Sequence, residues 1–86
     1  MNTSGKASLE ATALAPTEQI AKGGYYQHQN GGYYRVEDIG TNEPDLAETV
    51  AYRSMQNGKL WFRPVLVFLG QKDGRPRFIH KPNYMP

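Results

Sequence analysis

The longest apolar run, residues 60–69, is the feature that most limits how this chain can fold. It carries the only tryptophan and two of the three phenylalanines, and it lies between Asn57-Gly58 and Gly70. Side chains along a β-strand alternate between its two faces. A strand over this run therefore predicts a core face formed by Leu60, Phe62, Leu66 and Phe68. Its other face carries Trp61, Arg63, Val65 and Val67.

Pro64 lies inside this run and restricts how it can pair. Proline has no N–H to donate to a neighbouring strand. Three arrangements remain open: an edge position, a bulge, or a break between a strand that ends at Arg63 and a turn or second short strand from Val65.

Length and composition make aromatic packing the main source of stability. A chain of 86 residues forms one domain at most, and it has no cysteine for a disulfide or a thiolate metal site. The two histidines have no recognisable zinc spacing, so we expect neither a metal nor a cofactor. Six tyrosines, three phenylalanines and one tryptophan supply the packing instead.

The sequence also predicts a cytoplasmic protein that does not enter the membrane. No stretch approaches the roughly 20 apolar residues of a membrane span. The N-terminus lacks the basic segment followed by an apolar segment that marks a secretory signal.

Residues 1–22 form a separate compositional zone, rich in Ala, Ser and Thr and without an aromatic residue. Ser8 can cap a short helix over residues 9–15 that Pro16 would end. We expect a flexible or short-helical arm, and a monomer or a weak homodimer formed through it.

Residues 23–81 alternate short β-forming runs with turn signals. The expected strands cover residues 25–29, 33–40, 48–55, the opening run, and 75–80. Asn57-Gly58 and Asp73-Gly74 are signals for two-residue hairpin turns. The pattern predicts an all-β domain, a five-stranded antiparallel meander that curls into an SH3-like, partly open barrel. An open sheet covered by an N-terminal helix is the alternative, and residues 82–86 are expected to fray.

One candidate site lies on the first predicted hairpin. Tyr26 and His28 share a strand face, and Tyr34 is expected across the hairpin on the same side. Such a patch can bind a base, a methylated amine or a carboxylate. The alternative is a small core in which His28 is a hydrogen-bonded structural residue.

A second candidate site lies on the hairpin before the apolar run. A two-residue turn places Met55 opposite Leu60 and Tyr52 opposite Arg63, so Tyr52, Trp61 and Arg63 share one face. Tyrosine, tryptophan and arginine are enriched in binding hot spots, and arginine presents a planar fork to carboxylate or phosphate. Alternatively, Arg63 stacks on Trp61 or Tyr52 for structural reasons. Whether Trp61 is exposed distinguishes the two.

Charge is distributed unevenly along the chain. Five acidic residues fall between positions 37 and 48, and seven basic residues against one acid fall between positions 53 and 81. Arg53, Arg75 and Arg77 can therefore contribute to a basic face for nucleic acid. Solvated strand edges protected by charge explain the same residues.

Catalysis is not expected. The sequence has no glycine-rich phosphate loop, no nucleophile elbow and no cysteine nucleophile. His28 could pair with Glu37 or Asp38 as a general acid and base, but nothing in the sequence holds such a pair together.

Three ordered motifs resemble a small bacterial and phage family, the domain-of-unknown-function family 1653. The first is Gly24-x-Tyr26-x-His28-x-x-Gly31-x-x-Tyr34-x-Val36, the second Val50-Ala51-Tyr52-Arg53, and the third Leu60-Trp61-Phe62-Arg63-Pro64 with Phe68. The resemblance covers residues 23 to about 80. It departs from the family pattern at Asn30, where a lysine is usual, and at Val67, where a methionine is usual. It implies a small all-β domain and assigns no reaction.

These observations predict a small binding module without enzymatic activity. We expect a protein partner in preference to nucleic acid, bound through the face of Tyr52, Trp61 and Arg63. An accessory or inhibitory role, such as that of a phage protein docking on a host complex, suits a domain of this kind.

Overall fold

The structure, a computed structural model, describes residues 14–86 and is built around one antiparallel sheet. The five strands of the sheet stand in the order β4-β3-β2-β1-β7, and β5 and β6 form a separate hairpin. The elements in chain order are η1 (Pro16–Gln19), β1 (Tyr25–His28), β2 (Tyr33–Thr41), β3 (Glu48–Ser54), β4 (Leu60–Pro64), α2 (Val65–Phe68), β5 (Gln71–Lys72), β6 (Arg75–Pro76) and β7 (Phe78–His80). The predicted all-β class with five antiparallel strands is confirmed.

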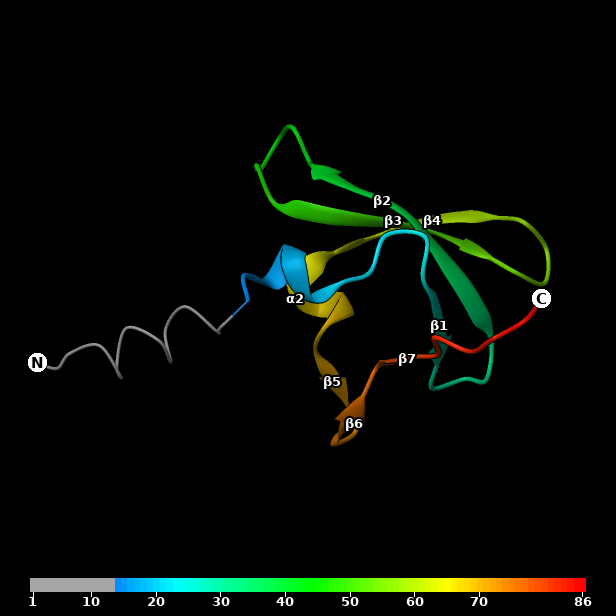
Figure 1. Cartoon of the computed structure of the whole chain (residues 1–86). Helices are drawn as coiled ribbons and strands as arrows, with labels where there is room; N and C mark the ends of the chain where they lie inside the picture. Colours follow the sequence, from blue (N-terminus) through cyan, green and yellow to red (C-terminus); the bar gives the residue numbers. More distant parts are fainter. Residues whose placement is uncertain (1–13) are drawn as a thin grey trace, which may run out of the picture.

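The strand order refines the predicted meander at its last step. Strands β1 to β4 follow one another as neighbours, but β7 pairs with β1 and not with β4. Figure 1 shows the chain leaving β4 through α2 and the β5–β6 hairpin before it forms β7 beside β1. The two edges of the sheet, β4 and β7, are not hydrogen-bonded to each other, so the described strands form no closed barrel.

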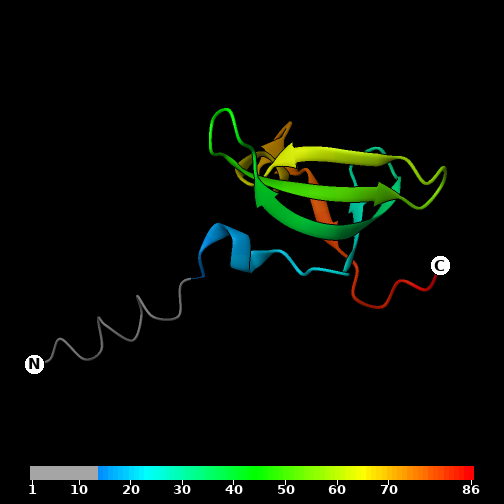
Figure 2. The ribbon, with the colours of Figure 1, turned by 90° about the horizontal axis from the view of Figure 1, so that it is seen from above.

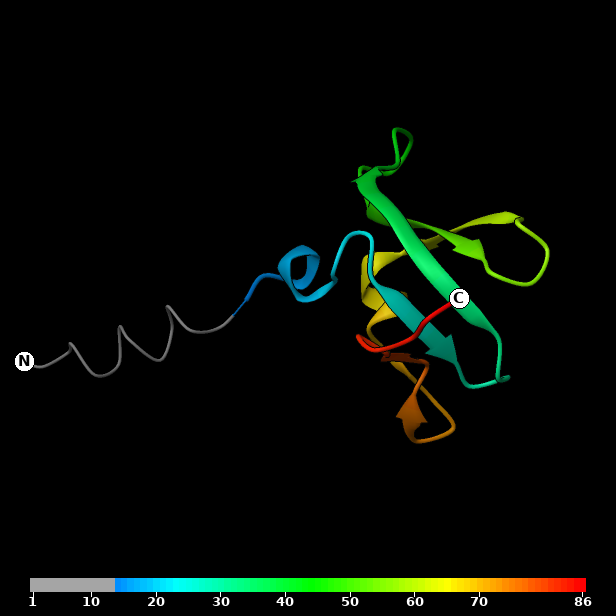
Figure 3. The same cartoon turned by 45° about the vertical axis from the view of Figure 1, so that its right-hand side comes forward.

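The sheet is strongly curved, which brings side chains from its two edges together. The β2–β3 pairing shifts register between Val36 and Asp38, and a bulge of this kind bends and twists a strand. Figures 2 and 3 show β2 as a long, bent strand that runs beside β3. As a result, the guanidinium carbon of Arg63 on β4 lies 5.9 Å from the ring centre of Phe78 on β7.

The concave face of the sheet holds the core. Its buried hydrophobic residues are Ile20, Tyr26, Val36, Val50, Tyr52, Val65, Phe68 and Phe78. Phe68 and Phe78 stack with their ring centres 4.1 Å apart, and Tyr52 meets both rings edge-on. Four of the eight buried hydrophobic residues are aromatic, so aromatic contacts are a major part of the packing.

The predicted core face of the apolar run is wrong for three of its four residues. Leu60, Phe62 and Leu66 are 36%, 67% and 71% exposed, and only Phe68 is buried. Leu60 and Phe62 alternate with Trp61 and Arg63 and therefore lie on the convex face, whereas the core lies on the concave face. Leu66 is exposed for another reason: Pro64 ends β4 and precedes the helical turn α2. A helical turn buries residues three apart, here Val65 and Phe68, instead of every second residue. A break at this point was one of the three arrangements left open.

The two expected hairpin turns also differ from each other. Asp73 and Gly74 both have positive φ, 56° and 76°, as a two-residue type I′ turn requires. Before β4 only Gly58 has positive φ (73°), and the loop is longer, so Tyr52 pairs with Trp61 and not with Arg63. The register is displaced by two residues. Because strand faces repeat every two residues, the faces of Tyr52, Trp61 and Arg63 are as predicted.

Residues at both ends of the described chain pack against the sheet. Ile20, which the sequence analysis assigns to the 1–22 arm, is 5% exposed and belongs to the core. At the other end, in the segment expected to fray, Tyr84 stacks on Tyr33 with ring centres 4.2 Å apart. The helix expected over residues 9–15 falls almost entirely outside the described residues. No helix in residues 14–86 is long and apolar enough to cross a membrane.

Candidate functional site

A small hollow of about 200 Å³ opens on the concave side of the sheet and collects most of the predicted site residues. It is lined by His28, Asn30, Tyr34, Tyr52, Trp61, Arg63 and Phe78. The strands β1, β2, β3, β4 and β7 each contribute at least one of these residues. The site therefore depends on the whole curved sheet and not on one hairpin.

Strand pairing explains how these residues meet. Tyr52 lies directly opposite Trp61, and Val50 opposite Arg63, so both β4 side chains point to the concave face. On the other side of the hollow, His28 lies opposite Phe78. Tyr34 bridges the two groups, with its ring centre 5.3 Å from Tyr52 and 6.0 Å from Phe78.

Arg63 supplies the positive charge of the site. Its Nε donates a hydrogen bond of 3.0 Å to the Tyr52 hydroxyl, which orients the guanidinium group. No described residue accepts a hydrogen bond from its two terminal nitrogens, and no carboxylate of residues 14–86 forms a salt bridge with it. The forked end of Arg63 can therefore bind an external carboxylate or phosphate.

Trp61 forms an exposed aromatic rim beside Arg63. Trp61 is 41% exposed, so it is not a core residue. The Nζ of Lys59 lies 4.5 Å from the centre of the Trp61 ring system, a cation–π contact. Trp61 is thus available for contact with a ligand. Arg63 differs, because its Nε forms a structural hydrogen bond and its two terminal nitrogens have no acceptor in residues 14–86.

His28 forms the opposite wall. Its ring packs edge-on against Phe78 at 4.8 Å, and its Nδ1 accepts a hydrogen bond of 3.1 Å from the backbone N–H of Asn30. Burial lowers the pKa of His28, and the positive charge of Arg63 lowers it further. A neutral His28 therefore presents an imidazole, and not a second cation, to the hollow at neutral pH.

The remaining predicted residues lie elsewhere. Tyr26 shares the concave face with Tyr34 as expected, but it is only 5% exposed. Its hydroxyl accepts a hydrogen bond of 2.9 Å from the N–H of Ala21, so Tyr26 is a core residue and the structural alternative holds for it. This places Tyr26 outside the surface that a ligand can reach.

The three other arginines predicted to belong to the site differ in their relation to Arg63: Arg53 lies on the other face, whereas Arg77, like Arg63, acts on the charge of His28. Arg53 lies on the convex face, where it contacts Glu37 and donates a 2.8 Å hydrogen bond to the carbonyl of Gly58. Arg75 is exposed on the small β5–β6 hairpin. Arg77 follows that hairpin, is partly buried, and keeps its Nε without a hydrogen-bond partner among the described residues.

Sequence reasoning missed two residues that line the hollow, Asn30 and Phe78. Asn30 is where the chain departs from the family pattern, and its Oδ1 accepts a hydrogen bond of 2.8 Å from Gly32 that shapes the turn. The sequence predicts Phe78 on the last strand, but it does not predict that this strand, β7, pairs with β1. Only the strand order could have placed it here.

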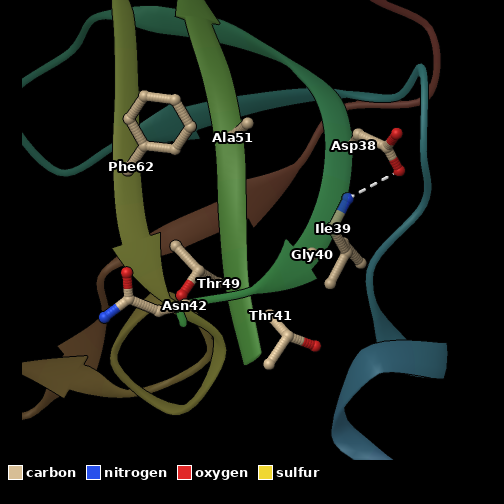
Figure 4. A pocket seen from close by; sticks show the side chains of 8 residues that line it. All are labelled: Asp38, Ile39, Gly40, Thr41, Asn42, Thr49, Ala51 and Phe62. Atoms are coloured by element: carbon tan, nitrogen blue, oxygen red, sulfur yellow. Dashed lines mark hydrogen bonds between the residues drawn. The ribbon is translucent and has the colours of Figure 1, made fainter. Parts of the chain in front are cut away.

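A second hollow lies on the convex face, on the other side of β4. It encloses about 330 Å³ over strands β2, β3 and β4, and Phe62 forms one of its walls (Figure 4). Ala51 lies between Phe62 and Asp38 in the strand pairing, and its small side chain leaves space between these two larger ones. The two hollows thus flank the same edge strand.

The part of the chain that the structure describes shows no cluster of side chains suited to a metal ion. No group of three or more histidine or acidic side chains in residues 14–86 is arranged to hold a metal ion. The acids that could pair with His28 in catalysis lie on the other face: Glu37 contacts Arg35, and Asp38 contacts Lys22.

Comparison with known proteins identifies the family. The family model described as "Protein of unknown function (DUF1653)" matches residues 24–80. The chain belongs to this family, as its three motifs indicated. No curated protein and no solved structure matches the chain significantly.

Proposed function

We propose that this protein is a small binding module without enzymatic activity, which docks on a protein partner through Tyr52, Trp61 and Arg63. The observation that carries the proposal is the pairing of an exposed Trp61 with an Arg63 whose forked end has no acceptor in the described chain. Tryptophan, tyrosine and arginine are the residue types that dominate binding energy at protein interfaces.

The chemistry of the hollow favours a carboxylate attached to an apolar group. Arg63 is held in place by Tyr52, so it loses little side-chain freedom when it binds an anion. The aromatic rings of Tyr34 and Phe78 provide an apolar wall around it. An acidic side chain or a chain terminus of a partner protein supplies both features.

Size and surface are consistent with an accessory or inhibitory role, for example that of a phage protein that docks on a host complex. The cytoplasm is the compartment that we propose for it, because a cysteine-free domain stabilised by aromatic packing needs no disulfides. A nucleic-acid target is the alternative. It is less favoured because Arg53, Arg63 and Arg75 lie on different parts of the molecule.

The proposal is tested by quantitative affinity capture with the full chain from cells that express it naturally. Arg63→Gln and Trp61→Ala should each reduce partner recovery, as expected for hot-spot residues worth about 2 kcal/mol or roughly 30-fold in affinity. Arg75→Gln and Leu66→Ala, both exposed and outside the hollow, serve as matched controls. Equal recovery by the folded Arg63 and Trp61 variants contradicts the proposal.

The nucleic-acid alternative makes a distinct prediction. If several phosphates are neutralised, the logarithm of the affinity falls steeply with the logarithm of the salt concentration. Arg75→Gln should then weaken binding about as much as Arg63→Gln does. A flat salt dependence together with an effect of Arg63 alone supports the protein partner.

A further inference from the structure

The strand that carries Trp61 and Arg63 is also a free edge of the sheet. Within residues 14–86, β4 pairs with β3 alone, and no strand of this part of the chain lies on its other side. The N–H of Ser54 donates to the carbonyl of Lys59, which makes these two residues a hydrogen-bonded pair. Such pairs alternate along an antiparallel ladder, so Trp61 and Arg63 also direct their backbone groups toward β3.

The backbone groups of Leu60 and Phe62 therefore point away from the sheet. They face away from β3, the strand that β4 pairs with, and no turn, loop or cap hydrogen bond of the backbone in residues 14–86 uses either N–H or either carbonyl. Two donors and two acceptors, spaced as in a strand, thus remain available at this edge. An extended segment that adds to such an edge gains main-chain hydrogen bonds along its length.

We propose that β4 takes up an extended segment of a partner protein as an additional strand, with acidic side chains on one face and apolar side chains on the other. This inference rests on the proposed function and specifies the form of the partner. The added strand would place alternate side chains over the hollow beside Trp61 and over the hollow beside Phe62.

The charges along β4 determine the chemistry of the segment. Lys59, Trp61 and Arg63 share the concave face, so the side chains laid over them meet two cations around an aromatic ring. Acidic residues fit this face by cross-strand pairing. On the convex face, Leu60 and Phe62 are 36% and 67% exposed and favour apolar residues.

The same charges disfavour pairing between two copies of this chain. If two β4 edges pair antiparallel with Leu60 opposite Phe62, Lys59 of one copy lies opposite Arg63 of the other, and like charges in that position are destabilising. If Phe62 pairs with Phe62, Leu60 lies opposite Pro64, which has no N–H to donate. A segment with acidic residues avoids the repulsion between like charges, and unlike a second copy of β4 it can pair with Leu60 and Phe62 without extending to Pro64.

The experiment is selection of random peptides of about 12 residues, displayed on phage, against the full chain, followed by binding measurements with the synthetic peptides. Selected peptides should alternate acidic and apolar residues over about five positions. On binding, the amides of Leu60 and Phe62 should become protected from hydrogen exchange in the unmodified chain. Failure to select a peptide, a selected set without alternation, or no protection of these amides overturns the inference.

Two substitutions at one position isolate the main-chain contact. Phe62→Thr and Phe62→Pro both remove the ring, but only proline removes the outward N–H, and an edge strand tolerates that loss. We expect Phe62→Pro to bind the peptide about tenfold more weakly than Phe62→Thr. Equal affinities of the two folded variants overturn the inference. If the proline variant does not fold, the hydrogen-exchange measurement on the unmodified chain decides instead.

The outcomes also separate this inference from the proposed function. Suppose that Arg63→Gln weakens peptide binding, but that Phe62→Pro and Phe62→Thr bind the peptides equally. This result contradicts the added strand and leaves the hollow as the docking site. Peptides that depend on neither position contradict both. A concentration-dependent dimer that Phe62→Pro dissociates shows a second copy at the edge and overturns the inference of a different partner.

Discussion

Individual side chains in this domain belong either to the core or to the candidate site. Tyr26 is a case in which the sequence does not predict which of the two. Tyr26, Tyr34 and Tyr52 share one face of the sheet, and strand parity predicts this correctly. Parity does not show that Ala21 folds back to donate to the Tyr26 hydroxyl. The contact depends on the path of residues 20–24, which no periodicity in the sequence specifies.

Tyr26→Phe should lower the free energy of unfolding by about 1 kcal/mol, because the N–H of Ala21 loses its acceptor. Urea denaturation measures the change. Tyr33→Phe is the matched control, since the Tyr33 hydroxyl forms no hydrogen bond with the described residues and its ring still stacks on Tyr84. Equal stability of the Tyr26 variant and the unmodified chain contradicts the assigned role.

His28 should titrate below the ordinary pKa of histidine, since burial and Arg63 both disfavour its charged form. Between the lowered and the ordinary pKa the unfolded chain binds more protons than the folded chain, so stability falls as the pH drops below the ordinary pKa of histidine. NMR titration of the imidazole checks the direction. Arg63→Gln should move the pKa back upward, and an unchanged midpoint in this variant contradicts the electrostatic contact.

Among the elements, β4 and α2 show where sequence patterns fail and why. Two-residue periodicity correctly placed Trp61 and Arg63 on the same face as Tyr52, even though the loop before them is longer than predicted. It assigned the core to the other face of β4, where Leu60 and Phe62 are exposed. It then failed beyond Pro64, because the chain changes from an extended strand to a helical turn. Proline indicated that a break was possible. The choice of a helical turn depends on the aromatic cluster that Phe68 joins.

Two neighbouring positions in α2 test this account. Phe68→Ala should cost about 3–5 kcal/mol, because Phe68 is 1% exposed and packs on Tyr26, Tyr52 and Phe78. Leu66→Ala, at a position 71% exposed, should change stability by no more than about 0.5 kcal/mol. Thermal or urea unfolding distinguishes them. Similar costs at both positions would mean that the strand pattern, and not the helical turn, describes this segment.

The folded domain as a whole extends beyond the segment that the family model matches. The family model begins at residue 24, whereas the core includes Ile20 and the packed chain extends to Tyr84. The composition change at Gly23-Gly24 suggested a domain boundary that leaves Ile20 out. Composition cannot reveal that a single apolar residue in an otherwise polar segment fills the core.

Removal of residues before Gly23 should therefore destabilise the domain. A chain that begins at Gly23 loses the buried Ile20 side chain and the hydrogen bond from Ala21 to Tyr26. Together these contacts are worth about 3 kcal/mol. Urea unfolding of this chain against one that begins at Leu14 measures the loss. Equal midpoints contradict the contribution of residues 14–22.

The docking of a partner on the concave hollow is tested most directly by hydrogen exchange of the full chain, free and in complex with its captured partner. The proposed site predicts protection along β4 and at the end of β1 that carries His28, with the β5–β6 hairpin unchanged. Protection confined to the hairpin around Arg75, with β4 exchanging as in the free protein, would contradict it.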